Sequence, residues 1–396
     1  MKNKIWEKQF LEVPLNNTLI IQLDAISLLY KYCQPMQYIS PFIVSVASIK
    51  LTQAEREVLR SLNPLGVIIF GRNVQDKAQV KNLIRDLKSC LTRKNGDKIP
   101  ILVDVEGGLV NRLKKLDKGQ YDYPSQKKYG DLAVKSSLQD AKDELEQNIT
   151  RMSKDILELG INTNCAPVLD LRHRNTAGFL ASRIFSDDIK IVKGLSILEA
   201  QVLYKQGIVP VIKHIPGHGR ATSDSHENLP IVTTSIKDLE VTDFEIFKTF
   251  DKVKISSMGM VGHVCYKSID PISPATQSKK VVRYIKDNLF SGILISDDIN
   301  MQALSGSIYE RADRILDAGV DVVLYGSGQL HEMKALSQLH KDKKTYLSEE
   351  KVSQINALYS KNLSCSITTI DFILLISLSL LFPLLRKYKK LRRQKA

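Results

Sequence analysis

Short apolar runs recur along the chain, and amphipathic segments separate them. Each run is five to seven residues long and is apolar almost throughout, rather than alternating between apolar and polar residues. Continuous apolarity of this kind is typical of strands buried on both faces, as in a parallel sheet. The eight runs are Phe42–Val46, Gly66–Phe70, Ile101–Val105, Cys165–Leu171, Val209–Lys213, Ser256–Val261, Gly292–Ser296 and Val320–Tyr325.

The intervals between the runs carry helical patterns. After the first run, Thr52 is placed to cap a helix, and Glu55 lies three residues later as its capping-box partner. Further helices are predicted over residues 78–91 and 138–159. A fourth is predicted over residues 197–207, where Gly207 is suited to closing the C-terminus.

Eight strands that alternate with helices over about 300 residues predict an α/β fold, a (β/α)8 barrel of the TIM type, as a single catalytic domain. A doubly wound open sheet is the alternative, but it would call for a glycine-rich nucleotide fingerprint after an early strand, and none is present. We expect an N-terminal extension at 1–41, the barrel at 42–345, a helix or linker at 346–366, and a hydrophobic segment with a basic tail at 367–396.

The charge of the chain is concentrated at its C-terminus. The formal net charge is +14, and seven positive charges with no acidic residue fall in the last eleven residues. The rest is only mildly basic and shows no nucleic-acid-binding motif, so we expect no nucleic-acid partner. The hydrophobic segment has an uncharged run of only fourteen residues from Phe372, whereas about 20 are needed to cross a bilayer. Membrane association through 367–396 and a tail without a membrane role both stay open.

The cysteines and the N-terminus predict a cytoplasmic protein, either free or attached to the membrane by the tail. The five cysteines are scattered, odd in number and never paired as CxxC, which suits reduced thiols. The first residues, MKNKIWEKQF, do not read as a secretory signal.

Charged residues follow three of the predicted strands. The third run ends in Asp104 and Glu106, the fifth in Lys213 and His214, and the seventh in Asp297 and Asp298. A charged residue at such a position either caps the next helix or faces the mouth of the barrel. Because the carboxyl ends of all eight strands meet at one face, three charged ends together favour a site at that mouth.

The stretch KHIPGHGRATSDSHENLP, residues 213–230, holds three of the seven histidines. A metal site would use His214 and His218 four residues apart, a spacing that needs a helix. Pro216, Gly217 and Gly219 prevent a helix there and predict a loop. We therefore expect no metal at this stretch, and the two glycines suggest that the loop moves when substrate binds.

Asp224 and His226 lie two residues apart in the same loop. An aspartate that accepts a hydrogen bond from one imidazole nitrogen fixes the tautomer, so that the other nitrogen can exchange a proton near neutral pH. A solvated polar loop without chemistry is the alternative, and the spacing alone does not decide between them.

Four blocks in order resemble the single-domain β-N-acetylhexosaminidases of glycoside hydrolase family 3, bacterial enzymes of peptidoglycan recycling. The blocks are GVIIFGRN, VDVEGGLVNR, KHIPGHGRATSDSH and ISDDINM, and the resemblance covers about residues 42–337. In the second block, Val105 and Leu109 depart from the polar residues expected there. The departure leaves both acids and the arginine of the block in place.

The resemblance implies a retaining exo-β-N-acetylglucosaminidase that works through a covalent glycosyl-enzyme, without metal or cofactor. Asp297 would be the nucleophile and His226 the general acid and base, with Asp224 as its orienting partner. The substrates would be peptidoglycan-derived muropeptides, in which N-acetylglucosamine is β-1,4-linked to an anhydro-N-acetylmuramic acid. Sugar binding would fall to Asp104, Arg112, Arg183, Lys213 and His214.

Two other functions compete with this interpretation. A family 3 exo-β-glucosidase would show SDW where this chain has SDD, and would take its acid/base from a second domain. A non-catalytic, membrane-tethered sugar-binding protein would have lost Asp297 or His226, and both are present.

Overall fold

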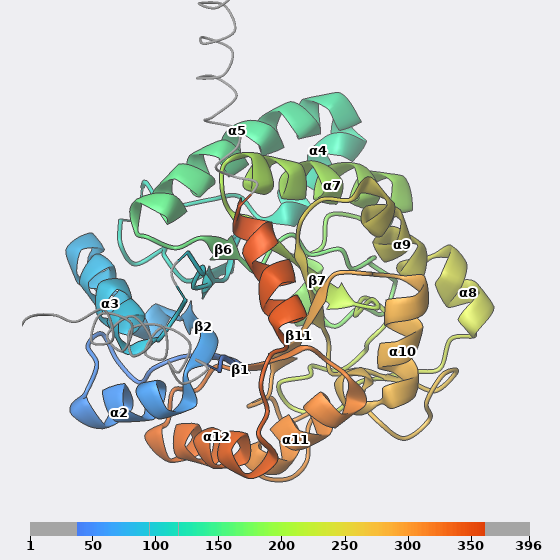
Figure 1. Ribbon diagram of the computed structural model, residues 1–396. Coiled ribbons are helices and arrows are strands. Elements are labelled where there is room, and N and C mark those ends of the chain that lie inside the picture. The colour runs from blue at the N-terminus through green and yellow to red at the C-terminus, as the bar shows by residue number, and fades with distance from the viewer. Residues whose placement is uncertain (1–37, 95, 118, 361–396) are drawn as a thin grey trace, which may run out of the picture. The chain divides into compact units, whose positions relative to one another are not determined.

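The computed structural model describes residues 38–94, 96–117 and 119–360. Eight parallel strands close into a barrel in the order β1-β2-β3-β6-β7-β9-β11-β12, so each strand pairs with the strand before and after it (Figure 1). The predicted (β/α)8 barrel is thereby confirmed. The barrel strands are β1 (Ser40–Val44), β2 (Pro64–Ile69), β3 (Ile101–Val103), β6 (Thr163–Asn164), β7 (Val209–Ile215), β9 (Met258–Val261), β11 (Ile293–Asp298) and β12 (Val322–Tyr325).

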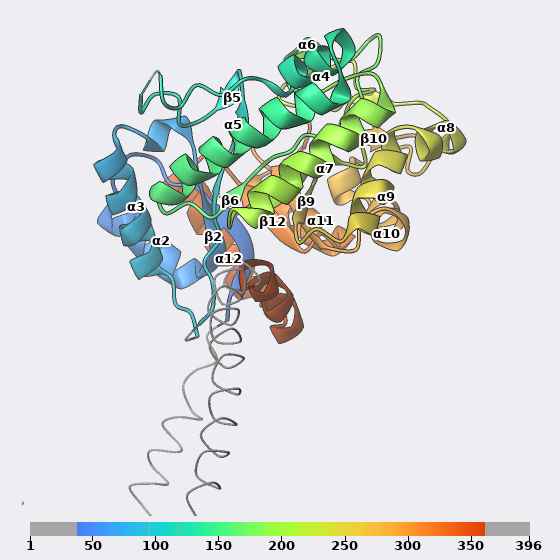
Figure 2. The same ribbon diagram turned by 90° about the horizontal axis from the view of Figure 1, so that it is seen from above.

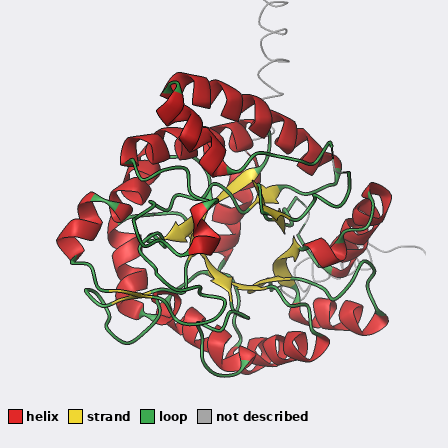
Figure 3. Ribbon diagram, turned by 180° about the vertical axis from the view of Figure 1, so that it is seen from behind, coloured by secondary structure: helices red, strands yellow, loops and turns green. Residues whose placement is uncertain are grey.

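Helices surround this ring of strands, as the view from behind shows (Figure 3). Two short sheets stand apart from the barrel, β4 (Val105–Gly107) with β5 (Val110–Asn111), and β8 (Ile231–Val232) with β10 (Cys265–Tyr266). The α-helices are α2 (Gln53–Leu62), α3 (Lys77–Cys90), α4 (Gln126–Lys135), α5 (Leu138–Glu158), α6 (Gly178–Ala181), α7 (Ile189–Lys205), α8 (Ile236–Val241), α9 (Asp243–Val253), α10 (Lys279–Asn288), α11 (Ile308–Ala318) and α12 (Leu330–Lys343).

The predicted elements correspond closely to the observed ones, and the fourth strand is the main difference. It was expected at Cys165–Leu171, but β6 lies just before that segment, at Thr163–Asn164. Pro167 lacks an N–H group to donate to a strand ladder. The backbone of the segment pairs with β7 at an isolated bridge between Val168 and Lys213. The apolar run therefore continues beyond the strand as a buried loop at the barrel mouth.

The predicted helix ends are largely correct. The capping box at α2 is present: Glu55 N donates to Thr52 Oγ1 at 3.2 Å, and Thr52 N donates to Glu55 Oε2 at 2.8 Å. Helix α7 has Gln206 as its C-cap, one residue before the expected Gly207. Gly207 follows at φ +97°, a left-handed conformation that glycine adopts without strain.

Side chains alternate between inward and outward positions along each strand, and charged residues occupy the inward positions at one end of the barrel. Inward positions recur every second residue. On β7, Val211 belongs to the apolar cluster inside the barrel, and the next inward residue is Lys213. On β11 the same step leads from Ile295 to Asp297, and Asp104 directly follows β3. The charged groups thus come after the apolar filling of the barrel, at the carboxyl ends of the strands.

The opposite end of the barrel, where the strands begin, is covered by a last helix over 349–360, drawn in red in Figure 1. Its residues Ile355 and Tyr359 are buried in the cluster inside the barrel. The Tyr359 hydroxyl lies 2.7 Å from Thr163 Oγ1 at the start of β6. The packing of this helix extends the apolar core of the barrel past the first residues of the strands.

The predicted hydrophobic segment and basic tail at 367–396 lie outside the described residues, as does most of the predicted N-terminal extension. Within the described ranges, no helix combines the length and apolarity needed to cross a membrane.

One buried carboxyl group lies in the helical layer, where α4, α5 and α7 pack side by side (Figure 2). Glu199 on α7 is fully buried, and its Oε2 accepts a hydrogen bond from Gln126 Nε2 on α4 at 2.9 Å. Its other oxygen has no partner within the described chain. Burial raises the pKa of Glu199 to about 8, so this side chain is largely protonated at neutral pH.

The first prediction concerns Glu199→Gln, a neutral side chain of the same shape. In the parent, the unfolded state loses its proton near pH 4.5 whereas the folded state keeps it until about pH 8. The free energy of unfolding of the parent therefore falls as pH rises through this window, and that of the variant does not. We therefore expect the variant to become more stable than the parent as pH rises from 5 to 8. At pH 8 the difference in free energy of unfolding, measured with urea, should be on the order of 3 kcal/mol.

The exposed Glu146 on the neighbouring α5 provides the control. Glu146→Gln should change the free energy of unfolding by less than about 0.5 kcal/mol at either pH. An effect of Glu199→Gln that is the same at pH 5 and pH 8 would contradict the protonated carboxyl.

Candidate active site

A pocket opens at the carboxyl ends of the strands, the face at which (β/α)8 barrels carry their active sites. Seven of the eight predicted site residues line it, and the eighth, Asp224, is hydrogen-bonded to one of them. The lining residues are Ile68, Phe70, Asp104, Glu106, Val110, Arg112, Phe179, Arg183, Lys213, His214, His218, Ser225, His226, Met260, Asp297, Asp298, Met301 and Leu324.

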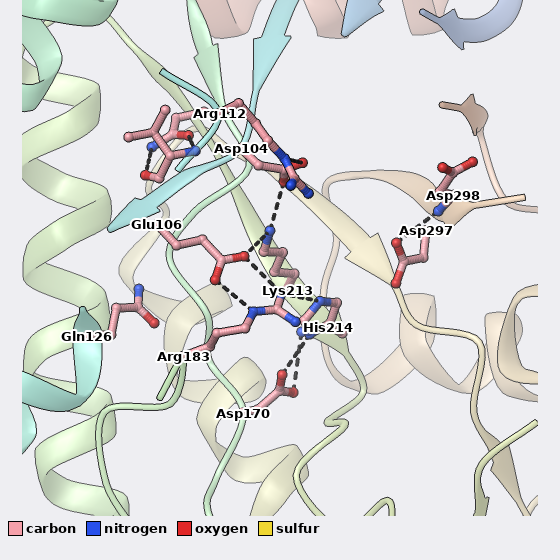
Figure 4. A network of polar contacts seen from close by, with 12 residues as sticks. Asp104, Glu106, Arg112, Gln126, Asp170, Arg183, Lys213, His214, Asp297 and Asp298 are labelled. Carbon is pink, nitrogen blue, oxygen red and sulfur yellow. Dashed lines mark hydrogen bonds and ion pairs between the residues drawn. The ribbon is translucent and has the colours of Figure 1, made fainter. Parts of the chain in front are cut away.

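A network of buried ion pairs forms one wall of the pocket (Figure 4). Lys213 Nζ lies 3.0 Å from Asp104 Oδ1 and 2.5 Å from Glu106 Oε1. Arg183 binds the same glutamate with two nitrogens, Nε to Oε2 at 2.8 Å and Nη2 to Oε1 at 2.9 Å. A bidentate guanidinium–carboxylate pair of this kind fixes both position and orientation.

In this wall, the attraction between opposite charges offsets the cost of burying each of them. Burial by itself would raise the pKa of Glu106, but Arg183 and Lys213 outweigh it and lower that pKa to about 2. Burial would likewise lower the pKa of Lys213, but Asp104 and Glu106 raise it above its usual value. Glu106 and Lys213 are therefore ionised at physiological pH, and they present fixed charges to whatever binds in the pocket.

His214 is held in a single tautomer. Its Nδ1 lies 2.7 Å from Asp170 Oδ2, and its Nε2 lies 3.3 Å from Arg183 Nη2. A guanidinium nitrogen only donates hydrogen bonds, so Nε2 must be the acceptor and Nδ1 must carry the proton. Asp170 also accepts from the backbone N–H of His218 at 2.6 Å, and through this bond it joins the end of β7 to the following loop.

Asp297 ends the inward series on β11 and is 7% exposed. Burial would raise the pKa of its carboxyl group, but His214, His263 and Lys213 nearby and a hydrogen bond from Asp298 N at 2.8 Å more than offset it. The pKa of Asp297 is therefore below its ordinary value. An ionised carboxylate in a pocket shielded from water has the charge that a nucleophile needs.

His226 lies on the loop that follows β7, and its side chain is 58% exposed. Its Nδ1 lies 2.7 Å from Asp224 Oδ1, which also accepts from the His226 backbone N–H at 2.9 Å. Burial opposes the charge on Asp224, but the hydrogen bonds from His226 outweigh it, so the pKa of Asp224 is lowered. The ionised Asp224 thus orients the imidazole, and Nε2 is left to exchange a proton at the pocket.

The two glycines of this loop serve close packing. A Cβ on Gly219 would lie 1.7 Å from the carbonyl oxygen of Leu171, and Gly217 has φ +138°. The Tyr266 hydroxyl donates to Gly217 O at 2.6 Å. In this structure the first part of the loop is thereby held against its neighbours. Movement of the loop on substrate binding stays a prediction.

Arg112 lies beside Asp104, at the edge of the same network (Figure 4). Its Nε lies 3.6 Å from Asp104 Oδ2, and its guanidinium group lies 5.4 Å from the centre of the Phe70 ring. Within the described chain its Nε is buried without a hydrogen-bond partner. A cationic group with donors to spare at the pocket wall is suited to binding a polar ligand.

Three further residues contribute to the site although the sequence analysis assigned them no functional role. Glu106 was noted only as a charged strand end, although it binds both Lys213 and Arg183. Asp170 lies near the end of the fourth apolar run and His263 just after the sixth, so the rule applied to the other strand ends points to them as well.

Two histidines meet at the mouth of the barrel. The rings of His214 and His218 are edge to face, with centroids 5.6 Å apart and planes at 71°, and both nitrogens of His214 have hydrogen-bond partners. Burial lowers the pKa of His218 to about 4, so its imidazole is neutral. In the part of the chain that the structure describes, no three His, Cys, Asp or Glu side chains are grouped to hold a metal ion.

Comparison with known proteins gives a consistent result. Residues 19–357 match the family described as the glycosyl hydrolase family 3 N terminal domain. A β-hexosaminidase from Haemophilus ducreyi is 31% identical over 290 residues, which cover 71% of this chain and 80% of the relative. A β-hexosaminidase from Neisseria meningitidis serogroup A is 32% identical over 290 residues, which cover 72% and 77% respectively.

A solved structure is similar over most of its length. NagZ from Neisseria gonorrhoeae, crystallised in complex with N-trifluoroacetyl-D-glucosamine, has a TM-score of 0.72 and is 27% identical in sequence. The alignment covers 82% of this chain and 91% of that one.

The second prediction concerns Asp170→Asn. The amide nitrogen that replaces one carboxylate oxygen cannot accept a hydrogen bond, so the variant should lose about 2 kcal/mol of unfolding free energy at pH 7. The pKa of Asp170 is below 3.8 in the folded protein, so its contribution is present above about pH 4 and is lost as pH falls further. The difference between parent and variant should therefore shrink towards pH 3.

Nitrogen NMR of ¹⁵N-histidine-labelled protein tests the tautomer directly. We expect His214 in the parent to carry its proton on Nδ1 and to change in Asp170→Asn. Asp187→Asn is the control, because the Asp187 side chain is 68% exposed. A parent spectrum with the proton on Nε2 would contradict the assignment.

Proposed function

This chain belongs to glycoside hydrolase family 3 and is a β-N-acetylhexosaminidase, and we propose that it removes terminal β-1,4-linked N-acetylglucosamine from muropeptides released from peptidoglycan. The observation that carries the mechanism is the arrangement of one pocket. Its wall holds an ionised Asp297, and the His226–Asp224 pair approaches it from an exposed loop.

In the first step, the Asp297 carboxylate attacks the anomeric carbon and the glycosidic bond breaks. His226, protonated on both nitrogens, transfers the proton of Nε2 to the departing oxygen. The Nδ1 proton stays in the hydrogen bond to Asp224, whose negative charge stabilises the imidazolium before transfer. The product is a covalent glycosyl-enzyme.

In the second step, neutral His226 accepts a proton on Nε2 from a water molecule. The water oxygen attacks the anomeric carbon, the bond to Asp297 breaks, and its carboxylate is regenerated. Two displacements at one carbon retain the β configuration. The histidine replaces the second carboxyl group that most retaining glycosidases use, and an unperturbed imidazole already titrates near neutral pH.

The charged wall would bind the sugar. Asp104 and the ionised Glu106 accept hydrogen bonds, whereas Lys213 and Arg183 hold them in place and donate to sugar hydroxyls. Arg112, beside Asp104, would donate to the same ligand. Because these groups are already oriented by one another, little ordering is required when the substrate binds.

The cytoplasm is the compartment that we propose for this reaction. Cys90, Cys165 and Cys265 are free thiols buried in the described chain, as expected in a reducing environment. Muropeptides recovered from wall turnover would be the substrates there.

The third prediction assigns the catalytic pair. With the full-length protein and an aryl N-acetyl-β-glucosaminide, Asp297→Ala should lower kcat/KM by at least about 10³-fold, because no covalent intermediate can form. His226→Ala should lower it by about 10²- to 10⁴-fold for a poor leaving group. Trapping of the intermediate by a 2-acetamido-5-fluoro glycoside, followed by mass spectrometry, should label Asp297. Label on another residue would overturn the assignment of the nucleophile.

The fourth prediction separates this function from an exo-β-glucosidase. The aryl N-acetyl-β-glucosaminide should exceed the matching β-glucoside in kcat/KM by at least about 100-fold, since the glucoside lacks the acetamido group. Chromatography of a digest of N-acetylglucosaminyl-β-1,4-anhydro-N-acetylmuramic acid should show free N-acetylglucosamine. Equal turnover of the two aryl glycosides would favour the glucosidase, and binding without turnover would favour a sugar-binding protein.

A further inference from the structure

Phe179 lies at the pocket between the buried wall and the catalytic loop. Its ring meets the imidazole of His226 edge to face, with centroids 6.0 Å apart and planes at 88°. It meets the imidazole of His218 in the same way, at 5.8 Å and 87°. The guanidinium group of Arg183 lies 6.0 Å from the centre of the ring. One aromatic side chain thus connects an exposed histidine to two buried, fixed groups.

The position of Phe179 is itself well supported. It belongs to the short helix α6 (Gly178–Ala181), and it packs against a small apolar cluster formed by Val168, Leu180 and Ile184. Each of these three residues is fully buried. Ala177 N, at the start of α6, donates to Ala221 O at 3.0 Å, so the helix is also joined to the catalytic loop.

The side chain of His226, by contrast, has few contacts that hold it in place. Its side chain is 58% exposed, and within the described residues Asp224 is the single side chain that hydrogen-bonds to the imidazole. Asp224 fixes one nitrogen but leaves the ring free to swing about that bond. A second contact is needed to direct Nε2 at the pocket, and Phe179 is the aromatic neighbour that provides it.

We propose that Phe179 is a positioning residue for the general acid and base, and that its ring holds the His226 imidazole over the pocket in the orientation needed for proton transfer. This inference rests on the function proposed above for His226. Aromatic pairs are energetically modest, so the effect of losing the ring corresponds to about a three- to tenfold change in rate.

The experiment uses the dependence of the first step on the leaving group. In the full-length enzyme, kcat/KM is measured for phenyl and for 2,4-dinitrophenyl N-acetyl-β-glucosaminide. Departure of phenol needs a proton from His226, whereas dinitrophenolate departs without one. We expect Phe179→Leu to lower kcat/KM for the phenyl substrate about three- to tenfold and to leave that for the dinitrophenyl substrate within twofold.

Two further variants separate the ring from its surroundings. Phe179→Tyr keeps the ring and should restore the phenyl rate to near that of the parent. Leu180→Ala keeps the ring but removes part of the packing that supports it, so its loss for the phenyl substrate should be smaller than that of Phe179→Leu. Phe179→Met, of similar size, replaces Phe179→Leu if the latter unfolds at lower temperature than the parent.

The result that would overturn the proposal is an equal loss for both substrates, which a role in sugar binding or in general packing predicts, or no loss for either. A greater leaving-group dependence in Leu180→Ala than in Phe179→Leu would overturn it as well. A double-mutant cycle adds an independent test: in the His226→Ala background, Phe179→Leu should have no further effect. If His226→Ala itself shows no leaving-group dependence, the proposed function fails rather than the role of Phe179.

Discussion

Lys213 carries its charge in a place that water hardly reaches, since its side chain is only 3% exposed. An unpaired ammonium there would be strongly unfavourable. Asp104 and Glu106 pair with it, Arg183 pairs with Glu106, and Arg183 in turn fixes the tautomer of His214. The mouth of the barrel is therefore organised around one buried cation. Removal of Glu106 would take away the acidic partner of Arg183 and one of the two acidic partners of Lys213, so the geometry of this wall depends on that carboxylate.

A consequence is that the pocket combines rigid and accessible parts. The wall of ion pairs and Asp297 are buried, and strand ends and mutual ion pairs hold them. His226, the proposed acid and base, comes from an exposed loop and contacts Asp224 and Phe179. Such a division suits the proposed mechanism, in which the nucleophile must remain dry while the proton carrier must meet both a leaving group and water.

Asp297 and its neighbour in sequence show how strongly position affects the pKa of a carboxyl group. Asp297 and Asp298 are adjacent in sequence, yet burial raises the pKa of Asp298 to about 6 while that of Asp297 is lowered. The difference comes from what faces each carboxyl group: His214, His263 and Lys213 lie near Asp297, whereas backbone N–H groups of Asn300 and Gly326 only partly offset the burial of Asp298.

The sequence by itself determined the barrel, because eight apolar runs alternating with helices leave few other ways to bury them. It also determined the charged strand ends, because these depend on local order along the chain. The spacing of Asp224 and His226 left a solvated polar loop open as the alternative, and the structure shows the hydrogen-bonded pair. Only the tertiary structure decided that Glu106 pairs with Lys213, that Asp170 pairs with His214, that Gly219 is required for contact with Leu171, and that Phe179 meets His226. Those contacts join segments far apart in sequence, and no local pattern specifies which side chains the closure of the barrel brings within reach of one another.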